Sequence, residues 1–198
     1  MTEHYFTEKP KSKIDLGIIR TYLRGRLFEF LTASGVFSKT RIDLGTRLLI
    51  ESMNLPEKGY ALDIGCGYGP VGIVAAVYNP DIHVVLTDLN ERALWLTKEN
   101  AKRNKAENVE IRKGFLYEPV KDMKFETILS NPPTTAGMKI VLPIIEQAPQ
   151  HLTEGGLLQI VVRSKISGKR LTTKIKETFG NIQILARQSG YRVLTAKN

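Results

Sequence analysis

The chain has 198 residues, of which 42% are hydrophobic and 25% charged, and it carries a net charge of +9. These values suit one globular domain with an appendage. The single cysteine, Cys66, excludes a disulfide framework and a cysteine-rich zinc site, and no apolar run reaches the roughly 18 residues of a membrane span. Since the first residues also lack the pattern of a signal peptide, we expect a cytoplasmic protein that holds no metal and contacts no membrane.

The N-terminal segment predicts a hairpin followed by a short helix. Residues 16–23 and 27–32 are apolar runs that flank the turn Arg24-Gly25-Arg26. Asp43 is a candidate N-cap for a helix that continues to Asn54. The apolar residues expected on one side of this helix are Leu44, Leu48, Leu49 and Met53.

From residue 59 onward, strand and helix patterns alternate. The predicted strands are 60–64, 82–87, 109–112, 125–129, 157–162, 182–186 and 191–195, and the predicted helices are 71–78, 90–104, 138–151 and 168–180. Glu154-Gly155-Gly156 predicts a turn before the fifth strand. The alternation predicts an α/β fold with a doubly wound, mostly parallel seven-stranded sheet, closed by an antiparallel pair at one edge. We expect residues 59–198 to form this domain and residues 1–58 to pack on it as an extension.

A glycine-rich loop follows the first strand of this domain, in the run Leu62-Asp63-Ile64-Gly65-Cys66-Gly67-Tyr68-Gly69. Glycines let a ligand approach the main chain, and the helix behind the loop supplies free N–H groups. The run from Gly67 to Gly72 also matches the dinucleotide fingerprint G-x-G-x-x-G, which keeps a nicotinamide cofactor open as an alternative. Asp63 would repel a pyrophosphate but suits an ammonium, or else it anchors the loop. A nucleoside with an amino acid tail, S-adenosylmethionine, is therefore the favoured cofactor.

The next two strand ends supply the rest of a nucleoside site. Asp88 ends the second strand, where a carboxylate can accept both hydroxyls of a ribose. Leu89 is suited to cover one face of an adenine, and Phe115 with Leu116 the other. The predicted cofactor-binding residues are Asp63, Gly65, Cys66, Gly67, Gly69, Asp88, Leu89, Phe115, Leu116 and Asn131.

The tetrapeptide Ser130-Asn131-Pro132-Pro133 ends the fourth strand, because two prolines cannot continue a hydrogen-bonded ladder. In an open α/β sheet, this carboxyl end is where ligands bind. The Asn131 carbonyl and nearby main-chain carbonyls form a rigid group of acceptors suited to hold an –NH2 group. We predict that Asn131, Pro132 and Pro133 are catalytic.

Positive charge is concentrated near the C-terminus, where residues 163–198 hold nine lysines and arginines against one glutamate, a net charge of +8. Such a segment attracts polyanions, although a solvated helix face gives the same pattern. The candidate RNA contacts in it are Arg163, Lys165, Lys169 and Arg170, with Arg20, Arg24 and Arg26 of the hairpin as further candidates.

These motifs resemble those of the class I S-adenosylmethionine-dependent methyltransferases, with Leu62–Gly69 as the first motif, Asp88 as the ribose carboxylate and Asn131-Pro132-Pro133 as the amino-methylating motif. The N-terminal part, including residues 4–10, 33–38 and 42–49, resembles the small-subunit ribosomal RNA guanine-N2 methyltransferases, in the single-domain form found among archaeal relatives. The resemblance implies transfer of a methyl group to guanine N2 in small-subunit ribosomal RNA or in an assembly intermediate.

Thr134 departs from this pattern, because many relatives have an aromatic residue there that stacks on the target base. Phe37 or another aromatic residue would then cover the base, or the target is held differently. Three other functions stay open: methylation of a glutamine in a release factor, methylation of DNA adenine, and a non-catalytic role as an RNA-binding assembly factor. The sequence does not predict the oligomeric state.

Overall fold

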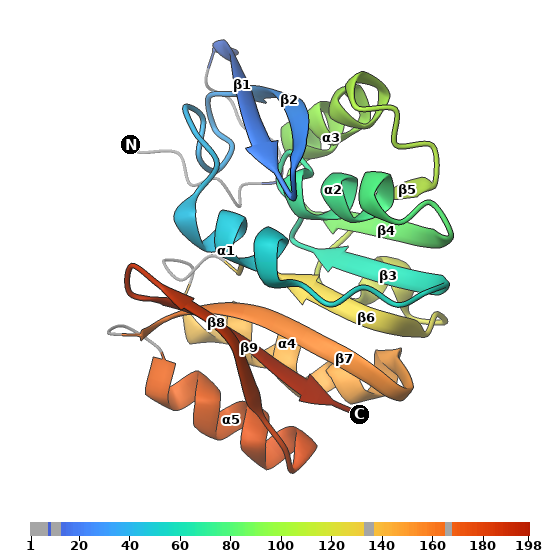
Figure 1. Ribbon diagram of the computed structural model, residues 1–198, viewed down its shortest axis with the longest axis vertical. Helices are drawn as coiled ribbons and strands as arrows, with labels where there is room; N and C mark the ends of the chain where they lie inside the picture. Colours follow the sequence, from blue (N-terminus) through green and yellow to red (C-terminus); the bar gives the residue numbers. More distant parts are fainter. Residues whose placement is uncertain (1–7, 9–12, 133–136, 165–167) are drawn as a thin grey trace.

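The computed structural model describes Glu8 and residues 13–132, 137–164 and 168–198. Within these residues, seven strands form one sheet in the order β5-β4-β3-β6-β7-β9-β8, and two strands form a separate hairpin (Figure 1). The strands are β1 (Leu16–Leu23), β2 (Arg26–Ala33), β3 (Gly59–Ile64), β4 (Ile82–Asp88), β5 (Val109–Lys113), β6 (Phe125–Ser130), β7 (Leu152–Arg163), β8 (Gln183–Gln188) and β9 (Tyr191–Lys197). The helices are α1 (Leu44–Ser52), α2 (Pro70–Tyr78), α3 (Glu91–Arg103), α4 (Met138–His151), α5 (Lys169–Phe179) and the short 3-10 helix η1 (Glu118–Val120).

The seven-stranded sheet confirms the predicted doubly wound α/β fold. β3 pairs in parallel with β4 on one side and with β6 on the other, and β9 is antiparallel to both β7 and β8. The chain therefore reverses its winding direction beside β3. Such a switch point opens a crevice at the carboxyl ends of the strands, where ligands bind in this type of sheet.

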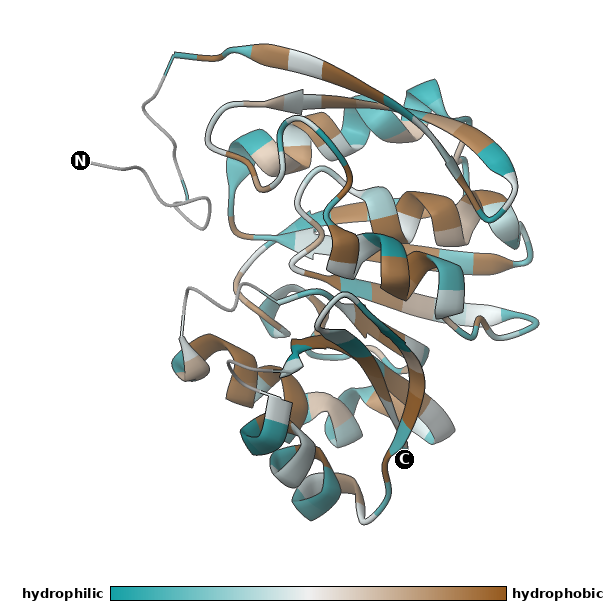
Figure 2. Cartoon of the chain, turned by 60° about the vertical axis from the view of Figure 1, so that its left-hand side comes forward, coloured by the Kyte–Doolittle hydropathy of each residue, from teal (hydrophilic) through white to brown (hydrophobic). Residues whose placement is uncertain are grey.

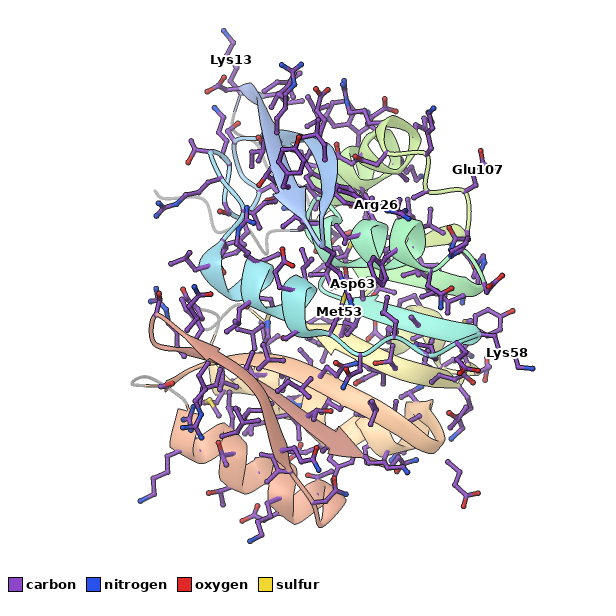
Figure 3. All side chains as sticks on the ribbon, viewed as in Figure 1. Lys13, Arg26, Met53, Lys58, Asp63 and Glu107 are labelled. Carbon is purple, nitrogen blue, oxygen red and sulfur yellow. The ribbon has the colours of Figure 1, made fainter. Side chains whose placement is uncertain are left out.

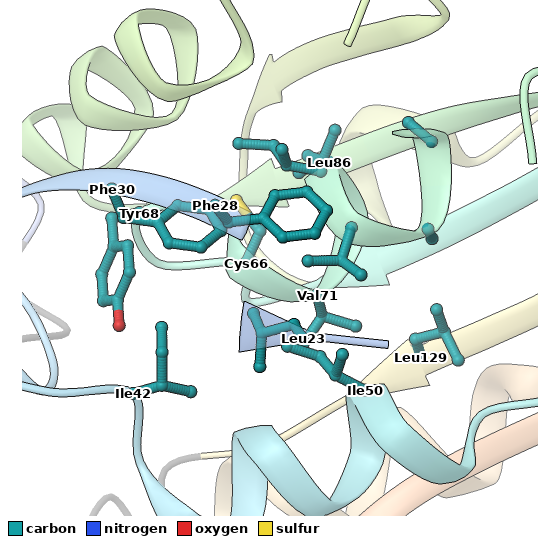
Figure 4. Close-up of a cluster of buried hydrophobic side chains, with 14 of the residues drawn as sticks. Leu23, Phe28, Phe30, Ile42, Ile50, Cys66, Tyr68, Val71, Leu86 and Leu129 are labelled. Carbon is teal, nitrogen blue, oxygen red and sulfur yellow. The ribbon is translucent and has the colours of Figure 1, made fainter. Parts of the chain in front are cut away.

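Helices cover both faces of the sheet. Buried side chains of α1, α2 and α3 share one hydrophobic cluster with the hairpin β1–β2, whereas those of α4 and α5 form a second cluster on the other face. Figure 2 shows apolar residues along the strands and hydrophilic ones on much of α5. In the first cluster, Phe28 and Phe30 of β2 lie against the glycine-loop residues Cys66 and Tyr68 (Figure 4). The hairpin thus packs against the glycine loop.

Asn100 of α3 and Asn104, the C-cap of this helix, hold the edge of the hairpin as a neighbouring strand would. Asn100 accepts from the Leu31 N–H (2.6 Å) and donates to the Leu31 carbonyl (2.9 Å). Asn104 makes the same pair of bonds with Glu29, at 3.1 and 2.8 Å. Four residues along a helix rise about 6 Å, close to two residues along a strand, so the spacings match. The bonds tie the hairpin to α3.

The structure corrects two details of the sequence prediction. Leu44 is 47% exposed, because the first turn of α1 buries its neighbours Gly45 and Thr46 instead, whereas Leu48, Leu49 and Met53 are buried as expected. Glu154-Gly155-Gly156 lies inside β7, which starts at Leu152 and pairs irregularly with β6. No helix among the described residues has the length and hydropathy needed to cross a membrane.

Candidate functional site

A cavity of about 360 Å³ lies at the carboxyl edge of the sheet, where β3, β4 and β6 end. The glycine loop, Asp88, Asn131 and Pro132 line it together, so the structure brings the predicted strand-end residues into one site. Side chains from α1 and β9 complete its walls. A volume of this size is in the range of small-molecule sites.

The glycine loop presents open main chain to this cavity. Gly65 and Gly67 have φ values of 72° and 60°, a left-handed region that favours glycine, and a Cβ atom at either position would meet no atom within 4 Å. The loop is held by β4, because the Gly65 and Cys66 N–H groups both donate to the Thr87 carbonyl at 2.9 Å. Burial raises the pKa of the Cys66 thiol well above its usual value, so this residue packs in its neutral form. A ligand can therefore approach the loop backbone closely.

Asp63 is buried at the end of β3 (Figure 3) and lines the cavity. Its Oδ2 accepts a hydrogen bond from the Gly72 N–H at 2.8 Å, which anchors the first turn of α2. Burial raises the pKa of this carboxyl to about 7, and the hydrogen bond from Gly72 offsets part of that effect. Asp63 can thus hold a proton or a cation inside the cavity near neutral pH.

Asp88 ends β4 and links the glycine loop to the start of α3 at the wall of the cavity. Its two oxygens accept from the Gly67 N–H at 2.8 Å and from the Asn90 N–H at 2.9 Å. Burial also raises the pKa of this carboxyl. Each carboxylate oxygen has a further acceptor direction, so Asp88 can still bind hydroxyl groups. Leu89, Phe115 and Leu116 line the cavity as well.

Asn131 is oriented by two side chains at the start of α1. Its Nδ2 donates to the Thr46 Oγ1 at 2.8 Å and to the Asp43 Oδ2 at 3.2 Å. The Asp43 carboxylate also caps α1 by accepting from the Gly45 and Thr46 N–H groups. Because an ionised carboxylate only accepts, the amide must turn its NH2 group toward Asp43. None of the residues that the structure describes donates to Asn131 Oδ1, which remains available as an acceptor.

Asp43 and Thr46 were not predicted as site residues. The sequence marks Asp43 only as a helix cap. The signal that could have pointed to both residues is that residues 42–49 are part of the resemblance to the guanine-N2 methyltransferases. Thr87 and Tyr191 also line the cavity without having been predicted, and the buried Thr87 Oγ1 has no hydrogen-bond partner among the described residues.

The predicted RNA contacts fall in different places. Phe37 and Arg163 line the cavity, whereas Lys169 and Arg170 are exposed on α5 and do not. Pro133, Thr134 and Lys165 lie outside the described residues, as do most of residues 4–10.

The hairpin arginines lie away from the cavity. The Arg24 guanidinium stacks on the Tyr78 ring at 3.9 Å, and Arg26 (Figure 3) donates to the Val77 carbonyl at 2.9 Å. Both contacts lie at the C-terminal end of α2, just before β4 begins. They are therefore near the amino ends of the parallel strands, whereas the cavity is at the carboxyl ends. Arg20 is paired with Glu29 at 2.6 Å. In the part of the chain that is described, no three His, Cys, Asp or Glu side chains gather as metal ligands.

Known proteins resemble this chain in sequence and in fold. The model of the methyltransferase small domain family matches residues 27–195. The uncharacterized protein YbxB of Bacillus subtilis (strain 168) is 40% identical over 199 residues, which cover 100% of this chain and 99% of that protein. Ribosomal RNA small subunit methyltransferase C of Photorhabdus laumondii is 36% identical over 83% of this chain and 48% of its own length. The Haemophilus influenzae (strain ATCC 51907) protein of that name is 31% identical over 98% of this chain and 60% of its own length.

The chain thus spans about half the length of the curated relatives that are named as methyltransferases. Among solved structures, the 16S rRNA N2 methyltransferase of Thermus thermophilus, in complex with AdoMet and guanosine, superimposes with a TM-score of 0.83. The alignment covers 95% of this chain and 52% of that one, at 23% identity. This likeness shows that the two share a fold.

Proposed function

Because the chain belongs to the methyltransferase small domain family, we propose that it transfers a methyl group from S-adenosylmethionine to the N2 amine of a guanine in small-subunit ribosomal RNA. The named relatives supply the class of substrate, since two of them are ribosomal RNA small subunit methyltransferases. The proposed substrate also places the chain in the cytoplasm, where ribosomal RNA is found. Free RNA and an assembly intermediate are the two candidate forms of this substrate.

The orientation of the Asn131 amide is the observation that carries this proposal. Thr46 and Asp43 hold its NH2 group, which leaves Oδ1 as an acceptor. We assign the carbonyl of Pro132, which also lines the cavity, as the second acceptor. An –NH2 group on a guanine has two hydrogens to donate. Two fixed acceptors at a strand end therefore fit it better than they fit a hydroxyl, which has one hydrogen.

The acceptors would also activate the amine. The lone pair of an exocyclic amine is delocalised into the ring, so the nitrogen is a poor nucleophile. When Asn131 Oδ1 and the Pro132 carbonyl accept its two hydrogens, the nitrogen is drawn toward tetrahedral geometry and its lone pair turns toward the cofactor. The bound cofactor would supply a sulfonium methyl group, with the electron pair of the carbon–sulfur bond passing to sulfur as the nitrogen–carbon bond forms. The nitrogen then loses one proton to water, and the acceptors stabilise the positive charge that develops on it.

The cofactor would lie across the ends of β3 and β4. We assign its ammonium to Asp63, its ribose hydroxyls to Asp88 and its adenine to the space between Leu89 and Phe115 with Leu116. The open main chain at Gly65 and Gly67 supports this assignment, because a side chain there would project into the free space.

Methyl transfer from radiolabelled S-adenosylmethionine tests the proposal. Small-subunit particles, naked small-subunit RNA and a release factor are offered in parallel, and the labelled RNA is digested to nucleosides. We expect label in RNA as N2-methylguanosine. Label in the release factor would instead support a protein glutamine methyltransferase, and label in neither would support a non-catalytic role.

A further inference from the structure

A methyltransferase that acts on a nucleobase must hold the ring as well as its amine. A base taken out of a stack is commonly sandwiched by aromatic side chains. Among the described residues, four aromatic ones line the cavity: Phe37, Tyr68, Phe115 and Tyr191. Tyr68 is buried against Phe30, and Phe115 is beside the proposed adenine position. Phe37 and Tyr191 remain as candidates to stack on the target base.

We infer that Tyr191 covers the face of the target base. This inference rests on the proposed function. Tyr191 is the first residue of β9, and β9 runs antiparallel to β7, so the residue lies at the carboxyl edge of the parallel strands, as Asn131 does. Figure 1 shows the β8–β9 turn at this edge, beside α1.

The start of α1 links Tyr191 to the acceptor group. A Cβ atom at Gly45 would lie 2.9 Å from the Cδ1 atom of the Tyr191 ring, so the ring packs closely on the Gly45 backbone. Gly45 lies between Asp43 and Thr46, the two residues that orient the Asn131 amide. One helical turn therefore positions both the amine acceptor and the aromatic ring.

Arg163 holds the outer end of the ring. Its Nε donates to the Tyr191 hydroxyl at 3.0 Å, and its guanidinium carbon is 5.1 Å from the ring centroid. The turn before Tyr191 is also fixed, because Ser189 and Gly190 have positive φ values and the Ser164 N–H donates to the Gly190 carbonyl at 2.9 Å. A ring fixed in this way loses little conformational freedom when a base stacks on it. Phe37 lacks a polar atom for such a bond.

Guanosine binding, measured by calorimetry with S-adenosylhomocysteine present, tests the inference. We expect Tyr191→Ala to weaken guanosine binding by about 10- to 100-fold, the usual loss when a stacking aromatic is removed. Tyr191→Leu keeps most of the volume without the ring, and we expect the same loss from it. Tyr191→Phe keeps the ring and should stay within about threefold of the native protein. S-adenosylhomocysteine affinity should change by less than about twofold in all three variants.

Tyr60→Ala is the matched control, because Tyr60 is an exposed aromatic residue at the opposite end of the sheet. Guanosine binding within twofold of native in both Tyr191→Ala and Tyr191→Leu would overturn the inference, as would a loss seen only in Phe37→Ala. If these variants bind normally while the native protein methylates guanine in RNA, only the inference fails. If the native protein neither binds guanosine nor methylates RNA, the proposed function fails with it.

Discussion

At the scale of single residues, Asn131 takes its orientation from side chains 85 and 88 positions earlier in the chain. The sequence predicts that Asn131 ends a strand, because Pro132 and Pro133 follow it. It does not predict the contact with Thr46 and Asp43, because that contact depends on how α1 packs over the sheet edge. The orientation of the acceptor in the proposed mechanism thus depends on two segments that are distant in the sequence.

Removal of the Thr46 hydroxyl should loosen this acceptor. Thr46→Val deletes the 2.8 Å bond to the Asn131 amide and keeps the side-chain shape. We expect kcat for methyl transfer to fall about fivefold, because one charge-neutral orienting hydrogen bond contributes about 1 kcal/mol. Cofactor affinity should not change. Thr178→Val, which removes a hydroxyl that bonds within α5, serves as the control. Equal activity in both variants would show that Thr46 does not orient Asn131.

Asp63 should make cofactor binding depend on pH. Its pKa in the free protein is raised to about 7 from an ordinary value of 3.8, so the carboxyl is mostly protonated at pH 6 and ionised at pH 8. An ammonium binds the ionised form, so S-adenosylmethionine affinity should rise as the pH increases from about 5.5 to 7.5 and then level off. Calorimetry on the native protein and on Asp63→Asn measures this. In Asp63→Asn, the increase in affinity that comes from ionisation of Asp63 should be absent. Parallel profiles of affinity against pH in the two proteins would contradict the assignment of the ammonium to Asp63.

At the scale of secondary-structure elements, the sequence predicts most of the fold. The pattern of apolar runs locates the strands and helices of the main sheet, and Asn90 and Asp43 cap α3 and α1 as expected. The length of β7 was missed, because Gly155 and Gly156 are typical of a turn but here lie within an irregular part of the strand. A local pattern predicts that Leu44 shares one side of α1 with Leu48, Leu49 and Met53, but not which residues of that side a neighbouring element covers.

The hairpin is joined to α3 by side-chain hydrogen bonds as well as by the apolar cluster, and Asn100 is the residue to test. It is fully buried and bonds to both backbone groups of Leu31 and to the Tyr68 carbonyl. Asn100→Ala should lower the free energy of unfolding by about 3 kcal/mol, because it leaves buried backbone groups without partners. Urea unfolding measures the loss. Asn181→Ala, which removes exposed bonds to Lys197, should cost less than about 1 kcal/mol. Similar losses in the two variants would mean that the hairpin does not depend on this clamp.

At the scale of the whole molecule, the proposed catalytic groups and the positive charge of α5 lie in separate regions. The cavity is lined by the strand ends, while Lys169 and Arg170 extend from α5 outside it. We therefore propose that α5 contacts RNA phosphates at a distance from the target nucleotide. The sequence predicts the charge of this helix, but not that Lys174 is paired with Glu146 at 2.5 Å.

The salt dependence of RNA binding tests this division. Each phosphate contact adds about 0.7 to the slope of log affinity against log salt for single-stranded RNA. The double variant Lys169→Glu with Arg170→Glu should reduce the magnitude of the slope by about 1.4 or more and weaken binding, with kcat at saturating RNA unchanged. Filter binding between 50 and 200 mM salt measures the slope. A slope equal to that of the native protein would place the RNA elsewhere.

The most direct test of the whole account is the identity of the methylated nucleoside. Small-subunit RNA is incubated with S-adenosylmethionine and either the native protein or Asn131→Ala, then digested and analysed by mass spectrometry. We expect N2-methylguanosine with the native protein and a rate lower by about 100-fold or more with the variant, since a fixed group that stabilises transition-state charge contributes on that scale. The variant should still bind the cofactor. N6-methyladenosine in place of N2-methylguanosine, or an Asn131→Ala variant as active as the native protein, would contradict the account.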